Sequence, residues 1–242
     1  MASSNKVSRL AVKSLNLKST VPVREQTVHV LREAILNLEL KPGQRLVERE
    51  FIDRLGVSRT TFREALRELS SEGLVTVIPQ KGARVAKPSM NEAADLYEIR
   101  AALESLVVTR FIECASDGEI SALAKTIDDF DGVVRRTTNT LELLESKEQI
   151  YAVLFKGARS NTFEQVLNGI KARVRVLRST SLSKPGRAID TAAELRSVVE
   201  AIIMRDVEAA TSLNTLHVQT AAKIAIDDLR ESQAEYSKEE AS

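Results

Sequence analysis

The sequence contains one cysteine, no tryptophan and two histidines, and aromatic residues make up only 4% of its 242 residues. The single thiol, Cys114, cannot form an internal disulfide or a thiolate zinc site, which excludes disulfide-stapled scaffolds and zinc fingers and favours a reducing compartment. Glycine and proline are also scarce, at 9 and 5 residues, while 43% of residues are hydrophobic. This composition excludes collagen-like and low-complexity classes for most of the chain and predicts a globular protein of one large domain or two small ones.

Long apolar runs are absent as well. No stretch approaches the roughly 18 residues that a membrane-spanning helix needs, and residues 1–20 lack the continuous apolar segment of a secretory signal. Those residues are basic and contain serine, as organelle transit peptides do, but a flexible basic tail is the simpler interpretation. We therefore expect a cytoplasmic protein with no membrane partner.

Charge is distributed unevenly along the chain, although the formal net charge is only +1. Residues 1–87 contain 16 Lys+Arg and 9 Asp+Glu, a net charge of +7, whereas residues 88–242 contain 19 and 25, a net charge of −6. Chance scatter of surface charge can produce such a split. It is also typical of a polyanion-binding module joined to a module that does not bind polyanions.

The basic part has the pattern of a helix-turn-helix. Apolar residues at helical spacing predict a helix over Thr27–Leu38 and a second helix over Glu48–Leu55. After a turn of two residues, the hydroxyl of Ser58 is placed to cap a third helix that runs to Ser71. Two short helices across a tight turn are typical of DNA-binding helix-turn-helix units.

A hairpin is predicted after the third helix. The β-branched run Leu74–Ile78 and the segment Ala83–Val85 are joined by residues 79–82, which are turn formers, so the hairpin would form a wing. Beyond Pro88 the helical pattern continues with short connections, which favours antiparallel neighbours. The expected helices span 90–115, 118–136, 141–159, 162–180, 190–204 and 206–231.

These patterns predict a mainly α protein with an N-terminal winged helix-turn-helix and a C-terminal antiparallel six-helix bundle. The expected domains are a flexible basic tail over 1–20, the winged helix-turn-helix over 21–87, a helical effector-binding and dimerisation domain over 88–231, and a polar tail over 232–242.

Arginines line one face of the third predicted helix. Arg59, Arg63 and Arg67 lie four residues apart, so a helix places them together. An arginine in the major groove can donate two hydrogen bonds to guanine, which discriminates that base by roughly 1–3 kcal/mol. Arg67 is flanked by Glu64 and Glu68, and local ion pairing is its simpler interpretation. Other cations and hydroxyls are candidates for phosphate contacts, namely Arg49, Thr60, Thr61, Lys81, Arg84 and the tail residues Lys6, Arg9, Lys13 and Lys18.

The segment from Leu55 to Leu69, followed by Glu72-Gly73-Leu74-Val75 and a wing with Gly82, closely resembles the winged-helix domain of GntR-family transcriptional regulators over about residues 23–87. Many family members have proline in place of Thr61, but threonine also occurs there in the FadR-type branch. The resemblance implies that the usual DNA contacts fall on this segment and that the wing tip approaches the minor groove. The expected DNA-binding residues are Arg49, Ser58, Arg59, Thr60, Thr61, Arg63, Lys81, Gly82 and Arg84.

The C-terminal half resembles the FCD effector domain of the FadR-type branch in its six-helix, VanR-like form. The resemblance rests on the all-helical pattern, on its length and on the opening segment Leu96–Arg100 followed by Leu103-Glu104. It implies a domain that binds a small carboxylate effector. Many members of that branch do so with a divalent metal, held by three histidines and a carboxylate.

That metal set is not present in the sequence. The chain has two histidines, so a site of three histidines is excluded by counting. Lys147 and Tyr151 stand where the family's aspartate and histidine would fall, Leu195 stands where another histidine would fall, and only His217 remains. We therefore expect no metal and no other cofactor.

Polar residues nevertheless interrupt the apolar stripes of the predicted bundle. Asn214 and His217 share the inward face of the last helix, and buried polar groups need partners. Because guanidinium groups suit carboxylates, we expect six residues to converge on a small anion. They are Tyr97, Arg100, Tyr151, Arg173, Asn214 and His217. The alternative is an internal ion-pair network, for example Arg100 with Glu104.

The function expected from these features is a homodimeric transcriptional repressor that binds a palindromic operator in double-stranded DNA and senses a small organic acid. An enzyme is the first alternative, but the sequence has no Ser/His/Asp order, no glycine-rich phosphate loop and no adequate metal ligand set, so no catalytic residue is expected. A non-specific architectural DNA binder is the second alternative.

Overall fold

The computed structural model of the chain describes residues 21–37 and 39–240. Side chains are not described at positions 161, 164, 165, 167–169, 171, 172, 176, 179, 180 and 232–240. Leu38 and the tail cations Lys6, Arg9, Lys13 and Lys18 lie outside the described residues. Contacts divide the chain into two units, Met1–Lys87 and Pro88–Ser242.

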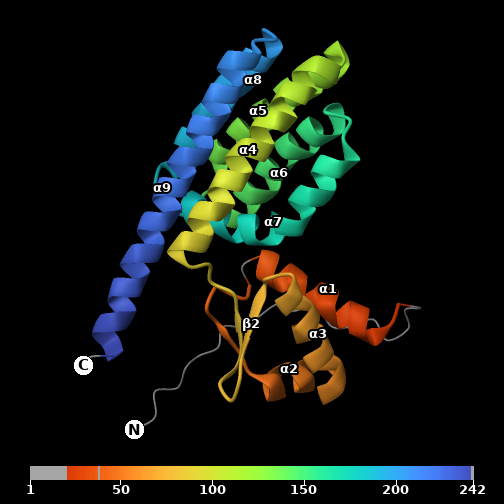
Figure 1. The fold of residues 1–242 in the computed structure, drawn as a ribbon, viewed down its shortest axis with the longest axis vertical. Helices are drawn as coiled ribbons and strands as arrows, with labels where there is room; N and C mark the ends of the chain where they lie inside the picture. The colour runs from red at the N-terminus through yellow and green to blue at the C-terminus, as the bar shows by residue number, and fades with distance from the viewer. Residues whose placement is uncertain (1–20, 38, 241–242) are drawn as a thin grey trace. The chain divides into compact units, whose positions relative to one another are not determined.

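The N-terminal unit is a winged helix-turn-helix, as predicted (Figure 1). Its elements are α1 (Val23–Leu36), β1 (Arg45–Leu46), α2 (Glu48–Leu55), α3 (Arg59–Ser71), β2 (Val75–Ile78) and β3 (Gly82–Val85). The three strands are antiparallel in the order β1-β3-β2. The sequence did not predict β1, because a strand of two residues is too short to show a period.

The turn between α2 and α3 depends on two local features. Gly56 ends α2 in the left-handed conformation, with a φ of 65°, which glycine adopts without a steric cost. Ser58 then caps α3, because its side-chain oxygen accepts a hydrogen bond of 3.1 Å from the backbone N–H of Thr61. The predicted start of the third helix is therefore confirmed.

The core of this unit orients α3. Phe62 of α3 is fully buried and stacks on Phe51 of α2, with ring centroids 5.8 Å apart. Two hydrogen bonds from Arg32 of α1 to the carboxylate of Glu72, which follows α3, tie the other side of the helix. Because one face of α3 is held in this way, its opposite face is presented at a fixed orientation to solvent.

The C-terminal unit consists of the six predicted helices (Figure 1). They are α4 (Met90–Cys114), α5 (Asp117–Arg136), α6 (Thr140–Gly157), α7 (Asn161–Leu182), α8 (Arg187–Ile203) and α9 (Val207–Glu240). Capping boxes at Ser89 and Ser116 fix the starts of α4 and α5. The main difference from the sequence prediction is that α9 continues to Glu240, so the polar segment expected to follow residue 231 is helical.

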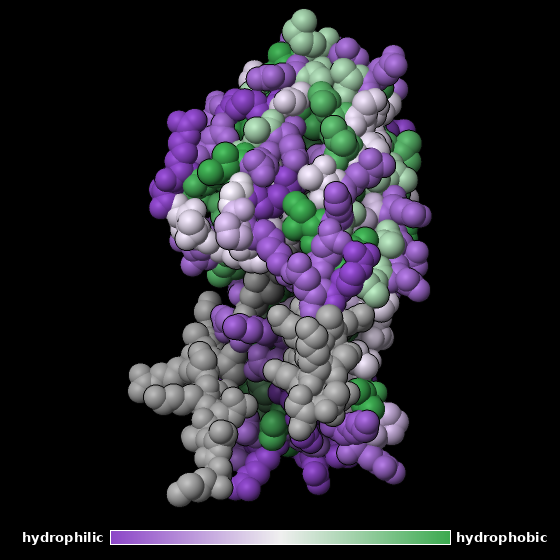
Figure 2. Space-filling model, turned by 90° about the vertical axis from the view of Figure 1, so that its left-hand side faces the viewer, coloured by the Kyte–Doolittle hydropathy of each residue, from purple (hydrophilic) through white to green (hydrophobic). Residues whose placement is uncertain are grey.

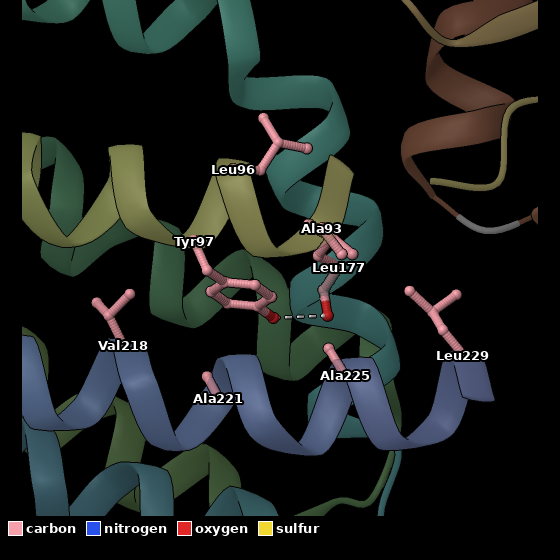
Figure 3. Packing of buried hydrophobic residues seen from close by; sticks show 8 residues of the cluster. All are labelled: Ala93, Leu96, Tyr97, Leu177, Val218, Ala221, Ala225 and Leu229. Atoms are coloured by element: carbon pink, nitrogen blue, oxygen red, sulfur yellow. Dashed lines mark hydrogen bonds between the residues drawn. The ribbon is translucent and has the colours of Figure 1, made fainter. Parts of the chain in front are cut away.

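Helices α4 and α9 run side by side in opposite directions (Figure 1). Figure 3 shows how their small and apolar side chains interlock, with Leu177 of α7 beside them. The hydroxyl of Tyr97 donates a hydrogen bond of 3.5 Å to the backbone oxygen of Leu177. The cluster consists of Ala93, Leu96, Tyr97, Leu177, Val218, Ala221, Ala225 and Leu229.

The described helices include none that is both long enough and apolar enough to cross a bilayer.

Gly157 provides a test of packing in the helical unit. A methyl group at this position would lie 2.3 Å from the ring of Phe111, so this fully buried ring would have to shift within the core. We expect Gly157→Ala to lower the free energy of unfolding by about 1–3 kcal/mol. Gly132 of α5 has no neighbour within 4 Å of such a methyl group, so Gly132→Ala serves as the matched control and should be neutral or stabilising. Denaturant unfolding followed by circular dichroism measures both, and equal stability of the two variants would contradict this packing.

Candidate functional site

The exposed face of α3 carries two arginines that one carboxylate holds. The side chains of Arg59 and Arg63 are 72% and 56% exposed. Glu48, the first residue of α2, accepts hydrogen bonds from Nε of Arg59 at 3.0 Å and from Nε of Arg63 at 2.9 Å. It also accepts one from Nη2 of Arg63 at 3.2 Å. No sequence pattern indicates this contact, because it joins two helices across the turn.

Glu48 fixes the direction of both arginines. The hydrogen bonds from Arg63, together with those from Arg59, lower the pKa of the Glu48 carboxyl against the opposing effect of burial, so it is ionised at neutral pH. On Arg59 this carboxylate contacts Nε alone, which leaves the two terminal nitrogens of that guanidinium available. A guanidinium whose Nε is hydrogen-bonded and whose terminal nitrogens are available is suited to bidentate recognition of a base edge.

A groove of about 510 Å³ lies between α3 and the wing. Its lining includes Arg45, Glu48, Arg63, Arg67, Gln80 and Gly82. At the wing tip Gly82 has a φ of 88°, a backbone conformation that other residues adopt only with strain. Lys81 and Arg84 are exposed, and Arg84 donates a hydrogen bond of 3.2 Å to the backbone oxygen of Gly43.

The remaining residues expected to bind DNA are also at the surface of this unit. The side chain of Arg49 is 91% exposed and lies 3.9 Å from Asp53. Thr60 is exposed, whereas Thr61 is half-buried and its hydroxyl lies 2.9 Å from that of Ser58. The local ion pair considered for Arg67 is not seen within 4.0 Å among the described residues, and Glu68 pairs with Arg24 instead.

A second polar cluster lies inside the helical unit. Arg100 of α4 is fully buried, and its Nε donates a hydrogen bond of 3.0 Å to Glu104. Arg178 of α7 donates one of 2.8 Å to the same carboxylate oxygen. Burial would raise the pKa of Glu104, but the two guanidinium groups lower it to about 2. The Arg100–Glu104 ion pair considered as an alternative is therefore present, and Arg178 extends it.

A chain of contacts continues from α6 to α8. Lys147 of α6 lies with its Nζ 3.1 Å from Nε2 of His217, and Nδ1 of His217 lies 2.5 Å from Glu194 of α8. Glu194 also accepts two hydrogen bonds from Arg187, at 2.6 and 2.7 Å. Burial raises the pKa of Glu194, while the hydrogen bonds from His217 and Arg187 lower it to about 2.

The other residues expected to bind an effector fall in two places. Tyr151 and Asn214 are buried, and Arg178 stacks over the Tyr151 ring with its guanidinium carbon 4.0 Å from the centroid. The guanidinium of Arg100 lies 5.1 Å from the ring centroid of Tyr97. Arg173 instead lies 3.9 Å from Glu92 in the first turn of α4 and is 32% exposed.

Several buried polar atoms in this cluster have no hydrogen-bond partner within 3.5 Å among the described residues. They include both terminal nitrogens of Arg100, the hydroxyl of Tyr151 and the amide nitrogen of Asn214, together with Oε2 of Glu104 and Nε of Arg178. Four of the partners that organise the cluster were not among the predicted site residues, namely Glu104, Arg178, Arg187 and Glu194. Glu104 lies four residues after Arg100 on α4, and the sequence indicated this pair only as the alternative to an anion site. Arg178, Arg187 and Glu194 lie on other helices, so no spacing pattern points to them.

The described residues contain no group of three or more His, Cys, Asp or Glu side chains that could hold a metal. Lys147 also does not fit a metal site. Its amine lies 3.1 Å from Nε2 of His217, the nitrogen that would bind the metal.

Comparison with known proteins identifies both units. Residues 23–85 match the family described as bacterial regulatory proteins, gntR family, and residues 95–220 match the FCD domain. The HTH-type transcriptional repressor RspR of Escherichia coli (strain K12) is 26% identical over 227 residues, covering 93% of this chain and 97% of RspR. The HTH-type transcriptional regulator YdhC of Bacillus subtilis (strain 168) is 25% identical over 194 residues, covering 80% of this chain and 87% of YdhC.

Solved structures share the fold. A protein from Rhodococcus sp. RHA1 described as a transcriptional regulator GntR has a TM-score of 0.69 at 21% identity, covering 84% of this chain and 97% of its own. McbR/YncC of E. coli has a TM-score of 0.67 at 17% identity, covering 85% and 98%. With a winged helix, an FCD domain and regulators rather than enzymes as relatives, this chain belongs to the GntR family of DNA-binding transcriptional regulators.

Proposed function

We propose that this regulator is a homodimeric repressor that binds a palindromic operator and leaves it when the helical unit binds a small organic acid. The relative RspR is named a repressor. On this similarity we propose that the present regulator also represses transcription. The protein would act in the cytoplasm, where its DNA is. Two arguments support the proposal, one from the recognition helix and one from the charged core.

The first argument concerns base reading by α3. Arg59 and Arg63 are exposed, lie on one face and are held by Glu48, so they are the candidates for contacts to guanine. Arg49, Ser58, Thr60 and Thr61 flank the same helix start and would contact phosphates. On the wing, Lys81 and Arg84 would contact phosphates beside the DNA minor groove, which the wing tip at Gly82 would approach.

The proposed sensing role rests on the buried Arg100. Its two terminal nitrogens are buried without a partner, and an unsatisfied buried charged group costs more than about 1–3 kcal/mol. A carboxylate bound between them would remove this cost. Tyr97, Tyr151 and His217 interact with the Arg100 guanidinium. In this proposal buried Asn214 would also contact the acid, and Arg173 would act at the edge, near Glu92.

A dimer surface is proposed on α4 and α9. Ile99 and Leu106 lie seven residues apart on one face of α4 and are 44% and 51% exposed. Leu216 of α9 is 60% exposed, and the hydrogen-bonded hydroxyls of Ser105 and Thr215 place Leu106 and Leu216 beside each other. Figure 2 shows one face of the helical unit, on which apolar and polar side chains are interspersed.

The mechanism follows from linkage between the two units. Binding of the acid would favour one separation of the two recognition helices in the dimer, and a palindromic operator accepts only a separation of about one helical turn of DNA. Because coupling is reciprocal, operator DNA must weaken binding of the acid by the same factor.

Substitutions at Glu48 and Arg63 test the base-reading argument. We expect Arg63→Ala to reduce discrimination between the operator and random DNA by about 5- to 150-fold, the equivalent of 1–3 kcal/mol. Glu48→Gln removes a negative charge but keeps the side-chain shape, so binding to random DNA should tighten while discrimination falls. Fluorescence anisotropy on an operator obtained by unbiased oligonucleotide selection measures both, with the exposed Arg110→Ala of α4 as control. Failure of the selection to enrich any site would favour an architectural DNA binder.

Titration of small carboxylic acids into the protein–operator complex tests the sensing role. We expect an acid that raises the melting temperature of the protein to release operator DNA as well. Arg100→Gln combined with Glu104→Gln replaces both charges of the buried pair with neutral polar groups, removes the carboxylate that Arg178 contacts, and should abolish both effects. Retention of acid-induced release by this double variant, shown to be folded by circular dichroism, would contradict the role of Arg100.

The dimer surface is tested by charge insertion. We expect Leu106→Glu, alone or with Leu216→Glu, to convert the dimer to a monomer in analytical ultracentrifugation, because a carboxylate would be buried without a partner at the interface. Ile189 of α8 is 66% exposed and lies outside the proposed surface, so Ile189→Glu is the matched control. A dimer that withstands the double substitution would place the interface elsewhere.

A further inference from the structure

Lys147 is a buried lysine that contacts a histidine instead of a carboxylate. It lies on α6 with only 3% of its surface exposed, and its Nζ is 3.1 Å from Nε2 of His217. The ion pairs of the described residues do not include one for Lys147 within 4.0 Å. Buried charged groups are normally paired, so this position requires an explanation.

The protonation of His217 decides what Lys147 does there. Burial, with Lys147 as the second cause, lowers the pKa of His217 to about 3, so the imidazole is neutral at neutral pH. Its Nδ1 carries the proton and donates to Glu194 at 2.5 Å, which leaves the Nε2 lone pair to accept a hydrogen bond from Lys147. A metal ion would need that same lone pair. The amine of Lys147 therefore stands where a metal bound to His217 would stand.

The charged groups that act on Lys147 come from α4, α7 and α8. Burial lowers the pKa of Lys147 well below its ordinary value, and the guanidinium groups of Arg178, Arg100 and Arg187 lower it further, whereas Glu104 raises it. A bound anion would also raise the pKa of Lys147. The protonated amine could then donate a hydrogen bond to the anion.

Further buried donors lie on α4, α6 and α9. Tyr151 lies one helical turn after Lys147 on α6, and its buried hydroxyl, which interacts with Arg100, makes no hydrogen bond within 3.5 Å in the described part of the chain. The terminal nitrogens of Arg100 and the amide nitrogen of Asn214 are unpartnered as well. These groups come from α4, α6 and α9 and need acceptor atoms, which a carboxylate supplies.

The charge of the cluster indicates how many carboxylates it accepts. Four cationic side chains, Arg100, Lys147, Arg178 and Arg187, face two carboxylates, Glu104 and Glu194. With His217 neutral, these groups carry two positive charges in excess when Lys147 holds its proton and one when it does not. A bound dicarboxylate would favour the protonated amine and neutralise both charges.

We propose that Lys147 takes the place of a divalent metal in this regulator and, with Arg100, holds a small dicarboxylate in the helical core without any metal ion. This proposal rests on the proposed sensing role of the core. It names dicarboxylates as the ligand class and Lys147 as the cation that replaces the metal.

The experiment uses the full-length protein and three probes, malonate, succinate and glutarate, in thermal-shift and isothermal titration measurements with and without EDTA. We expect at least one diacid to stabilise the wild type equally with EDTA and with added Zn²⁺ or Mn²⁺. Lys147→Met should weaken its binding by about 10-fold or more, as expected for loss of a charge-assisted hydrogen bond. Lys156→Met, on the exposed side of the same helix, should bind as the wild type does.

Lys147→Asp adds a test that does not depend on loss of binding. It places a carboxylate beside His217, so this variant alone should gain diacid binding that requires Zn²⁺ or Mn²⁺. Diacid binding by the wild type that disappears with EDTA, or unchanged binding by Lys147→Met, would overturn the role of Lys147 while leaving the sensing role intact. Absence of binding by all three diacids, while monocarboxylates bind, would overturn the ligand class. If no carboxylate binds the wild type at all, the proposed sensing role fails as well.

Discussion

The helical unit depends on how it keeps buried charges paired. Arg100 and Glu104 of α4 meet Arg178 of α7, and Glu194 of α8 holds Arg187 and His217, so ion pairs and hydrogen bonds join four of the helices. Removing one partner from such a pair typically costs about 3–5 kcal/mol, because the other charge stays buried. A hydrocarbon core carries no such risk. A ligand that supplies the acceptors missing at Arg100 would account for the buried charges.

The recognition helix also has cations paired with a shared carboxylate. Glu48 binds both Arg59 and Arg63 while these side chains remain accessible, so two cations are held close together without mutual repulsion. Such preorganisation reduces the side-chain entropy lost when DNA binds. The core and the recognition helix thus use one device, a carboxylate shared between two guanidinium groups. In the core the device is buried, and on α3 it faces solvent.

The sequence predicted the architecture well because the architecture depends on local signals. Ser58 and Ser116 mark helix starts through capping, Gly56 marks a helix end, and the apolar periods of the six C-terminal helices are regular. The sites were predicted only in part. Arg100 and His217 stood out as polar residues on apolar stripes, but their partners Arg178 and Glu194 lie on other helices. The role of Glu48 likewise depends on a contact between helices, which no spacing rule reveals.

We propose that a dicarboxylate completes the charged core without a metal. A crystal structure of the full-length protein grown with malonate and EDTA would show whether it does. We expect a malonate with one carboxylate within hydrogen-bond distance of Arg100 and the other within that distance of Lys147. A core that contains only water there, or a metal ion bound to His217 with Lys147 turned away, would contradict it.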